Sequence, residues 1–191
     1  MASKYPRIDL AGLKTMSIED RASKVSARDF ARPCKRGSSV AELIEGLPDI
    51  LAGRWLRTLI DRIVSARAVG KPVVAAMGAH VIKCGLSPII ADLVRRGVIT
   101  TVAFNGAGAI HDSEIALFGR TSEDVVEGMG RGMFGMALET AEFLNGAAKD
   151  AATQDLGLGE ALGRAIVERN APHRDVSLLA VAYECDVPVT V

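Results

Sequence analysis

A strand–helix–strand pattern in the middle of the chain places the strongest constraint on the fold. Residues 72–78 are short, apolar and uncharged, which is typical of a strand buried on both faces of a parallel sheet. Residues 98–104 are rich in β-branched side chains and predict a second strand. Between them, Ser87 is expected to cap a helix that has Pro88 at its first position and ends at Gly97. The pattern therefore predicts an α/β fold with a parallel sheet.

Further helices are expected on both sides of this unit. Ser39 and Glu42 have the spacing of a capping box, which predicts a short helix after Ser39. Apolar residues recur at helical spacing over residues 50–68, where Trp55 is expected to anchor the helix in the core. Three later helices and a final strand are predicted over residues 122–145, 156–170, 175–184 and 187–191.

The domain organisation follows from the same patterns. Residues 1–37 are expected to form an arm, which is either a solvated or subunit-wrapping extension or a basic segment that binds anionic groups. Residues 38–191 are expected to form one α/β domain. A buried parallel strand normally leads into a ligand-facing loop and a covering helix. A chain that ends in a strand at Val191 therefore predicts a domain that is incomplete at its C-terminus.

Charge and composition narrow the function classes. The 23 basic residues equal the 23 acidic ones, and aromatic residues make up only 4%, so a nucleic-acid-binding surface is not expected. No apolar run approaches the roughly 20 residues of a membrane span, and no secretory signal is visible. The 3 cysteines are far apart, which favours reduced thiols in a cytoplasmic protein. No spacing of histidines or cysteines indicates a metal site.

Two glycine motifs have different expected roles. Gly106 and Gly108 follow the second strand, where a glycine turn exposes backbone N–H groups to a phosphate or carboxylate, or serves only as a tight turn. Because His111 stands at the third glycine position, the standard dinucleotide fingerprint is rejected. The motif GxGxxG at residues 130–135 follows a helical pattern rather than a strand, which favours close helix packing.

A polar set is expected around the glycine turn. His80 and His111 stand just beyond the ends of the two strands, and parallel strands end at the same edge of a sheet. A histidine there either moves protons or simply forms a hydrogen bond in its loop. The predicted set is His80, Lys83, Asn105, His111, Asp112 and Glu114.

Residues 77–112 resemble the deoxyhypusine synthase family, and residues 182–189 look like the family's passage from a helix to a strand. The resemblance rests on the segment Phe104-Asn105-Gly106-Ala107-Gly108-Ala109-Ile110-His111-Asp112. It implies a Rossmann-like sheet that binds NAD across a subunit interface in a homotetramer. Members of this family oxidise spermidine and transfer an aminobutyl group to a protein lysine, through an imine on a catalytic lysine.

Matched residue by residue, the resemblance implies NAD contacts at Asn105, Gly106, Ala107 and Gly108. His111 is the expected catalytic residue, and the expected contacts to the small-molecule substrate are His80, Lys83, Asp112 and Glu114.

The departures from the family pattern also carry predictions. Ile110 and His111 replace the family's paired glutamates, and Lys83 and Cys84 replace serines, so an anionic substrate is expected rather than spermidine. The family's catalytic lysine comes after the strand at which this chain stops. An active transferase would therefore need a second chain or a longer one. The alternatives are a non-catalytic oligomeric ligand-binding or assembly protein and a hydrolase or lyase that uses His80 and His111 without NAD.

Overall fold

The computed structural model describes residue 5 and residues 8–191. The chain divides into two compact units, the first ending at Asp61 and the second beginning at Arg62. Among the residues that the structure describes, none of the helices has both the length and the apolar character needed to cross a bilayer.

The first unit is organised around a short helix, α1 (Val40–Gly46). The predicted capping box is confirmed: the Ser39 N–H donates to Glu42 Oε2 over 2.6 Å, and the Glu42 N–H donates to Ser39 Oγ over 3.2 Å. A single 3₁₀ turn, η1 (Ala27–Asp29), precedes it within residues 8–39. Backbone bonds from Arg32 to Gly46 and from Asp49 to Asp29 attach this turn and its flanks to the end of α1 and to the segment that follows it.

Helix α2 (Leu51–Ala68) has the predicted extent, but its expected burial is wrong. None of its residues is buried, and the Trp55 side chain is 69% exposed instead of anchoring a core. Its first half is fixed by polar contacts, since the Arg57 guanidinium donates to the Leu47 carbonyl over 2.9 Å and to Asp49 over 2.8 Å. Periodicity thus predicts the helix and not what its apolar face contacts.

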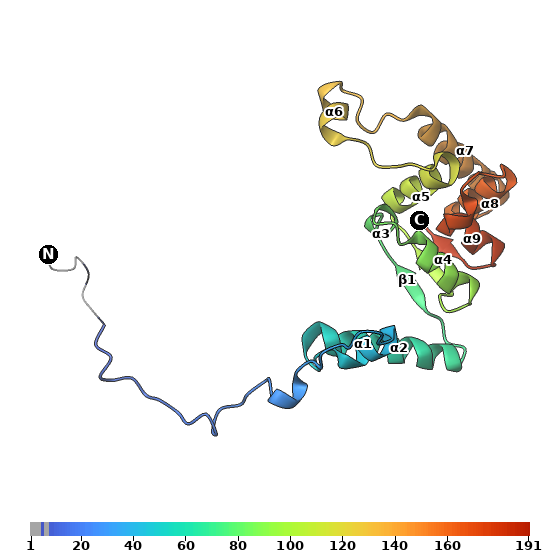
Figure 1. Ribbon diagram of the computed structural model, residues 1–191. Helices are drawn as coiled ribbons and strands as arrows, with labels where there is room; N and C mark the ends of the chain where they lie inside the picture. Colours follow the sequence, from blue (N-terminus) through green and yellow to red (C-terminus); the bar gives the residue numbers. More distant parts are fainter. Residues whose placement is uncertain (1–4, 6–7) are drawn as a thin grey trace. The chain divides into compact units, whose positions relative to one another are not determined.

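The second unit contains a parallel sheet of three strands in the order β1 (Val74–Ala76), β2 (Thr101–Ala103) and β3 (Val189–Thr190). Helix α4 (Ser87–Arg95) connects the first two strands, so the predicted strand–helix–strand unit is confirmed (Figure 1). In the register, Val102 is the neighbour of both Ala75 and Val189. The second unit is therefore a mixed α/β fold with a small parallel sheet.

Only one face of this sheet is buried. Val102 and Val189, which share a face, are 0% and 8% exposed, while Val74 on the opposite face is 58% exposed. The expectation that residues 72–78 are buried on both faces is therefore wrong. The packed helices cover the face that carries Val102, and the other face lacks an equivalent layer in the second unit.

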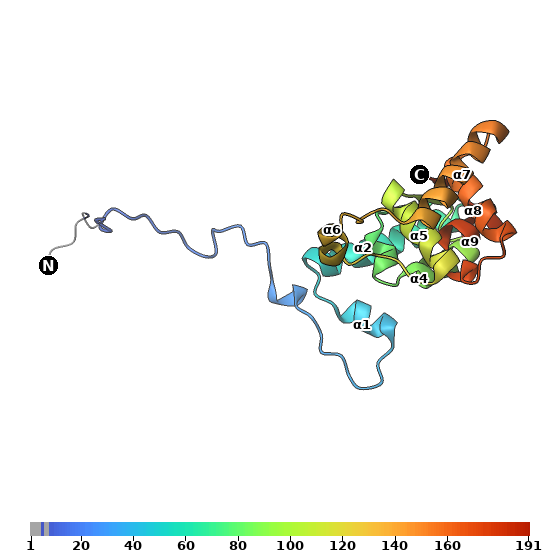
Figure 2. The ribbon, with the colours of Figure 1, turned by 90° about the horizontal axis from the view of Figure 1, so that it is seen from above.

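The remaining helices follow β1 and β2. They are α3 (His80–Lys83), α5 (Gly106–Phe118), α6 (Val125–Gly130), α7 (Leu138–Gln154), α8 (Leu158–Glu168), the 3₁₀ turn η2 (Arg174–Val176) and α9 (Leu178–Glu184). The expected single helix over residues 122–145 is wrong. Gly132 and Gly135 have φ values of +66° and +77°, which break the helical path between α6 and α7. Figures 1 and 2 show α6 on a long loop that leaves the packed helices.

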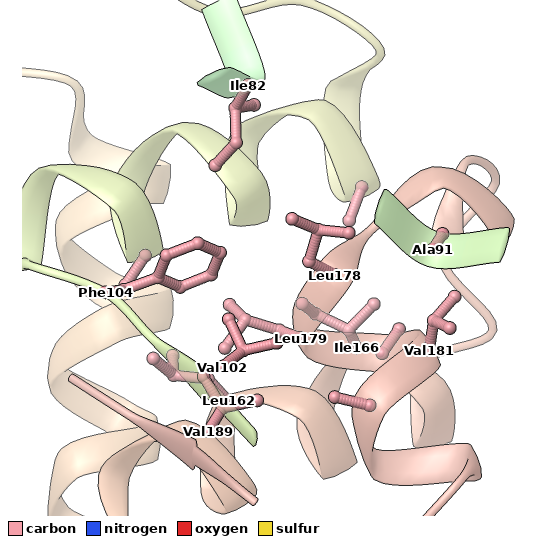
Figure 3. Close-up of a cluster of buried hydrophobic side chains, with 14 of the residues drawn as sticks. Ile82, Ala91, Val102, Phe104, Leu162, Ile166, Leu178, Leu179, Val181 and Val189 are labelled. Atoms are coloured by element: carbon pink, nitrogen blue, oxygen red, sulfur yellow. The ribbon is translucent and has the colours of Figure 1, made fainter. Parts of the chain in front are cut away.

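The core lies between the sheet and helices α8 and α9. Leu162, Ile166, Leu178 and Leu179 are fully buried, and Figure 3 shows Leu162 and Leu179 beside Val102. Close packing here requires small residues on α8. A Cβ atom at position 159 would collide with the Val189 carbonyl, and one at position 163 with the Leu179 carbonyl. The glycines of α8 therefore let this helix lie directly against β3 and α9.

Helix α4 begins differently from the prediction. Leu86 occupies the N-cap position and Ser87 is already helical, so the expected Ser87 cap is wrong. The buried Ser87 hydroxyl has no hydrogen-bond partner in the described part of the chain. The predicted end is confirmed, because Gly97 follows the helix in the left-handed conformation with φ +65°.

Candidate functional site at the sheet edge

The chain segments that follow β1 and β2 meet at one edge of the sheet, as the parallel pairing predicts. The Met77 N–H donates to the Ala103 carbonyl over 2.9 Å, which extends the pairing past the end of β1. The next residue, Gly78, lies against Asn105, because a Cβ atom there would be 3.7 Å from the Asn105 amide nitrogen. This edge holds the residues expected to contact a cofactor.

The expected glycine turn is wrong in its local structure, because residues 106–108 form the first turn of α5. Asn105 is the N-cap residue, and its side-chain oxygen accepts from the Gly108 N–H over 2.9 Å. The first N–H groups of a helix have no partner within the helix. Those of Gly106 and Ala107 also have none elsewhere in the described residues, and both residues are exposed. The edge therefore presents two free backbone donors.

The two glycines of this turn have different surroundings. A Cβ atom at position 108 would lie 3.0 Å from the Phe104 ring, so glycine lets the helix start directly over that side chain. A Cβ atom at position 106 would meet no atom within 4 Å. Gly108 therefore serves packing, while Gly106 leaves open space in front of the free N–H groups.

His80 and Lys83 lie on α3, a short helix that the sequence patterns do not predict. Its Ile82 side chain is 5% exposed and joins the core, which leaves His80 and Lys83 exposed. Helix α3 packs against α5. The structure thus places an imidazole and a cationic side chain on a helix that packs against α5.

Asp112 lies away from this edge, in the interior. It is 1% exposed, and its carboxylate accepts from the Ser177 hydroxyl over 2.6 Å and from the Leu178 and Leu179 N–H groups over 2.8 and 3.0 Å. Burial raises the pKa of Asp112 above its ordinary value of 3.8, while these three hydrogen bonds act in the opposite direction. The expected substrate contact therefore has a structural position, where it stabilises the start of α9.

His111 and Glu114 face a third environment. His111 Nδ1 lies 2.5 Å from Thr121 Oγ1, and the Thr121 hydroxyl donates to Glu114 Oε2. The Thr140 hydroxyl donates to Glu114 Oε1 over 2.9 Å. Sequence reasoning missed both threonines, which lie in the loop after α5 and on α7. Position alone gives no signal for them, because the reversal of the chain after α5 brings Thr121 to Glu114, and the packing of α7 against α5 brings Thr140 there.

The structure therefore divides the predicted polar set into three groups. His80, Lys83 and Asn105 stay at the sheet edge, His111 and Glu114 join two threonines, and Asp112 belongs to the core. Among the described residues, no group of three or more His, Cys, Asp or Glu side chains is arranged to hold a metal ion. The first turn of α5 combines the two free N–H donors with open space at Gly106, and such a helix start suits an anionic group.

Comparison with known proteins gives no independent indication of function. No protein-family model matches the chain, and no curated protein matches it either.

Proposed function

We propose that this chain is a deoxyhypusine synthase-like protein that binds NAD through the start of α5. The observation that carries the proposal is the pair of free N–H groups at Gly106 and Ala107, beside the open space at Gly106. A helix N-terminus at the carboxyl edge of a parallel sheet favours phosphate through its donors and its dipole. Exposed Lys83 on neighbouring α3 adds positive charge. These features support a site for the cofactor's pyrophosphate.

The proposed reaction class is NAD-dependent group transfer to or from a substrate other than spermidine. Bound NAD would supply a hydride acceptor. Ile110 and His111 offer no carboxylate to a polyamine, and both oxygens of Asp112 are already in use inside the core. Exposed His80 and Lys83 instead favour a substrate with an anionic group. His111 is proposed to accept or return a proton during the reaction.

A titration with NAD tests the cofactor, with isothermal calorimetry as the readout. Gly106→Val fills the open space in front of the free N–H groups, and we expect at least a roughly tenfold loss of affinity. Gly146→Val is the matched control, because position 146 also lies on a helix and its Cβ atom would meet nothing within 4 Å. Binding that is absent in the native chain, or equal in the two variants, would overturn the proposal.

A second candidate function, assembly without catalysis, is favoured by the exposed apolar surface. Helix α2 buries none of its residues, and Val74 on the open sheet face is 58% exposed. Apolar faces of this kind are typical of contacts with another protein. Sedimentation velocity with and without NAD separates the two functions. Self-association with no effect of NAD would favour assembly, while a monomer that binds NAD would exclude it.

A further inference from the structure

Four side chains from three segments form a continuous hydrogen-bonded chain. His111 and Glu114 lie one turn apart on α5, and Gly119, with φ +67°, ends this helix and reverses the backbone. The reversal brings Thr121 between them, so that Thr121 Oγ1 contacts both His111 Nδ1 and Glu114 Oε2. Thr140, on the first turn of α7, occupies the other oxygen of Glu114. His111 and Glu114 are 18% and 16% exposed, so the chain is largely shielded from water.

The single hydroxyl proton of Thr121 fixes the direction of these bonds. An ionised carboxylate can only accept hydrogen bonds, so Thr121 must donate its proton to Glu114. The Thr121 oxygen can then only accept from His111, and Nδ1 must be the nitrogen that carries a proton. In a neutral imidazole, this arrangement leaves Nε2 with a free lone pair.

We propose that Thr121 and Glu114 are positioning residues that hold His111 in the Nδ1–H tautomer, with Nε2 as the proton acceptor. This assignment rests on the proposed function, which places His111 at the reaction. A substrate O–H or N–H group gives its proton to Nε2, while the bonding electron pair stays on the substrate oxygen or nitrogen. The resulting imidazolium is stabilised through Thr121 by the Glu114 carboxylate, which lies 3.8 Å from Nδ1.

The same geometry gives Glu114 a role other than the expected substrate contact. Glu114 lines a cleft of about 320 Å³ together with Thr121 and Thr140. Both of its carboxylate oxygens already accept a threonine hydroxyl. A ligand in this cleft would therefore have to displace a partly buried hydrogen bond in order to use Glu114, which disfavours direct binding.

The tautomer of His111 is measurable in the full chain by ¹⁵N NMR of the histidine rings at a pH where they are neutral. We expect His111 to carry its proton on Nδ1, and the exposed His80 provides an internal reference for a ring in water. Thr121→Val removes the hydroxyl, so His111 should change to the tautomer that His80 shows. Thr121→Ser restores the hydroxyl and should restore the Nδ1–H form. Thr140→Val leaves the Thr121 bond in place and should leave the tautomer unchanged.

Two outcomes overturn the proposal: a native His111 with its proton on Nε2, or an Nδ1–H form that persists in Thr121→Val. Neither outcome depends on the cofactor, because the spectra are recorded without NAD. A chain that shows the Nδ1–H tautomer but binds no NAD would refute the proposed cofactor and support the hydrogen-bonded chain.

Discussion

The starts of α5 and α9 solve the same chemical problem in opposite ways. Each helix begins with N–H groups that need an acceptor. At α9, Asp112 accepts from Leu178 and Leu179, and the Ser177 hydroxyl accepts from Ala180, so the first turn is fully bonded in the interior. At α5, the uncharged Asn105 side chain accepts from the Gly108 N–H, and the exposed N–H groups of Gly106 and Ala107 have no partner among the described residues.

The difference separates a structural helix start from one that is available to a ligand. A buried helix start must find its acceptors within the protein, because an unbonded donor there costs about 1–3 kcal/mol. An exposed start can bond to water and exchange that water for a phosphate at small cost. The same helix geometry therefore stabilises the core at α9 and supports a binding site at α5.

The largest expected effect follows from removing the buried acceptor. Asp112→Ala leaves the Ser177 hydroxyl proton and two backbone N–H groups without an acceptor, so we expect the free energy of unfolding to fall by about 3 kcal/mol or more. Urea denaturation followed by circular dichroism measures the change. Asp175→Ala, at an exposed position, is the control and should change stability by less than about 0.5 kcal/mol. Equal unfolding curves for the two variants would contradict the structural role of Asp112.

The helix start at α9 also shows where sequence reasoning fails. The family resemblance implies a substrate contact at Asp112, four residues after Gly108. On a helix, however, the face on which a residue lies decides where its side chain points. The face of α5 that carries Asp112 packs against α9. The prediction of a glycine turn at Gly106 and Gly108 is wrong for a related reason. A strand end followed by Asn and Gly fits both a turn and a capped helix, and the continuation of the helix decides between them.

Elements with a strong local pattern were predicted well. Each of these elements is encoded by residues that are close together in the sequence. The capping box of α1, the extent of α2 and the end of α4 at Gly97 are all confirmed. Burial was predicted poorly, because it depends on distant segments. Trp55 and Val74 are both apolar and both exposed, because the described residues of the unit to which each belongs form no packed layer over the face that carries it. The Thr121 and Thr140 contacts to Glu114 likewise depend on the path of the chain after α5.

A comparison of the two glycines at the start of α5 has a smaller expected effect. An alanine Cβ at position 108 would press on the Phe104 ring at 3.0 Å, so Gly108→Ala should lower stability by about 1–2 kcal/mol. Gly106→Ala meets open space and gains helix propensity, so it should be neutral or stabilising by up to about 1 kcal/mol. Thermal unfolding of both variants measures this difference. Equal destabilisation by the two alanines would show that the first turn is packed rather than open.

The smallest expected effect is the change of stability with pH. Of the two helix starts, only that of α9 is capped by a group that titrates, the Asp112 carboxyl. Burial raises the pKa of Asp112 above 3.8, so the folded state holds this proton more tightly than the unfolded state. The stabilisation by Asp112 is therefore complete at a pH below the pKa of the unfolded chain, which is the ordinary value of 3.8. It declines as the pH rises through the higher pKa of the folded state. Asp112→Asn keeps an acceptor oxygen but cannot titrate. The stability advantage of the native chain over Asp112→Asn should therefore shrink as the pH rises above about 4.

A carboxylate placed at the exposed start of α5 by substitution should make the stability depend on pH with the opposite sign. In Asn105→Asp, the free N–H groups and the helix dipole of α5 favour the charged form and lower the pKa of the new carboxyl, because water still solvates it. Its stabilisation of about 0.3–1 kcal/mol should be present above about pH 4 and lost as the pH falls. Denaturation curves of both variants across this range measure the two slopes. Slopes of the same sign would mean that the α5 start is as desolvated as the α9 start, and the open site for a phosphate would then be excluded.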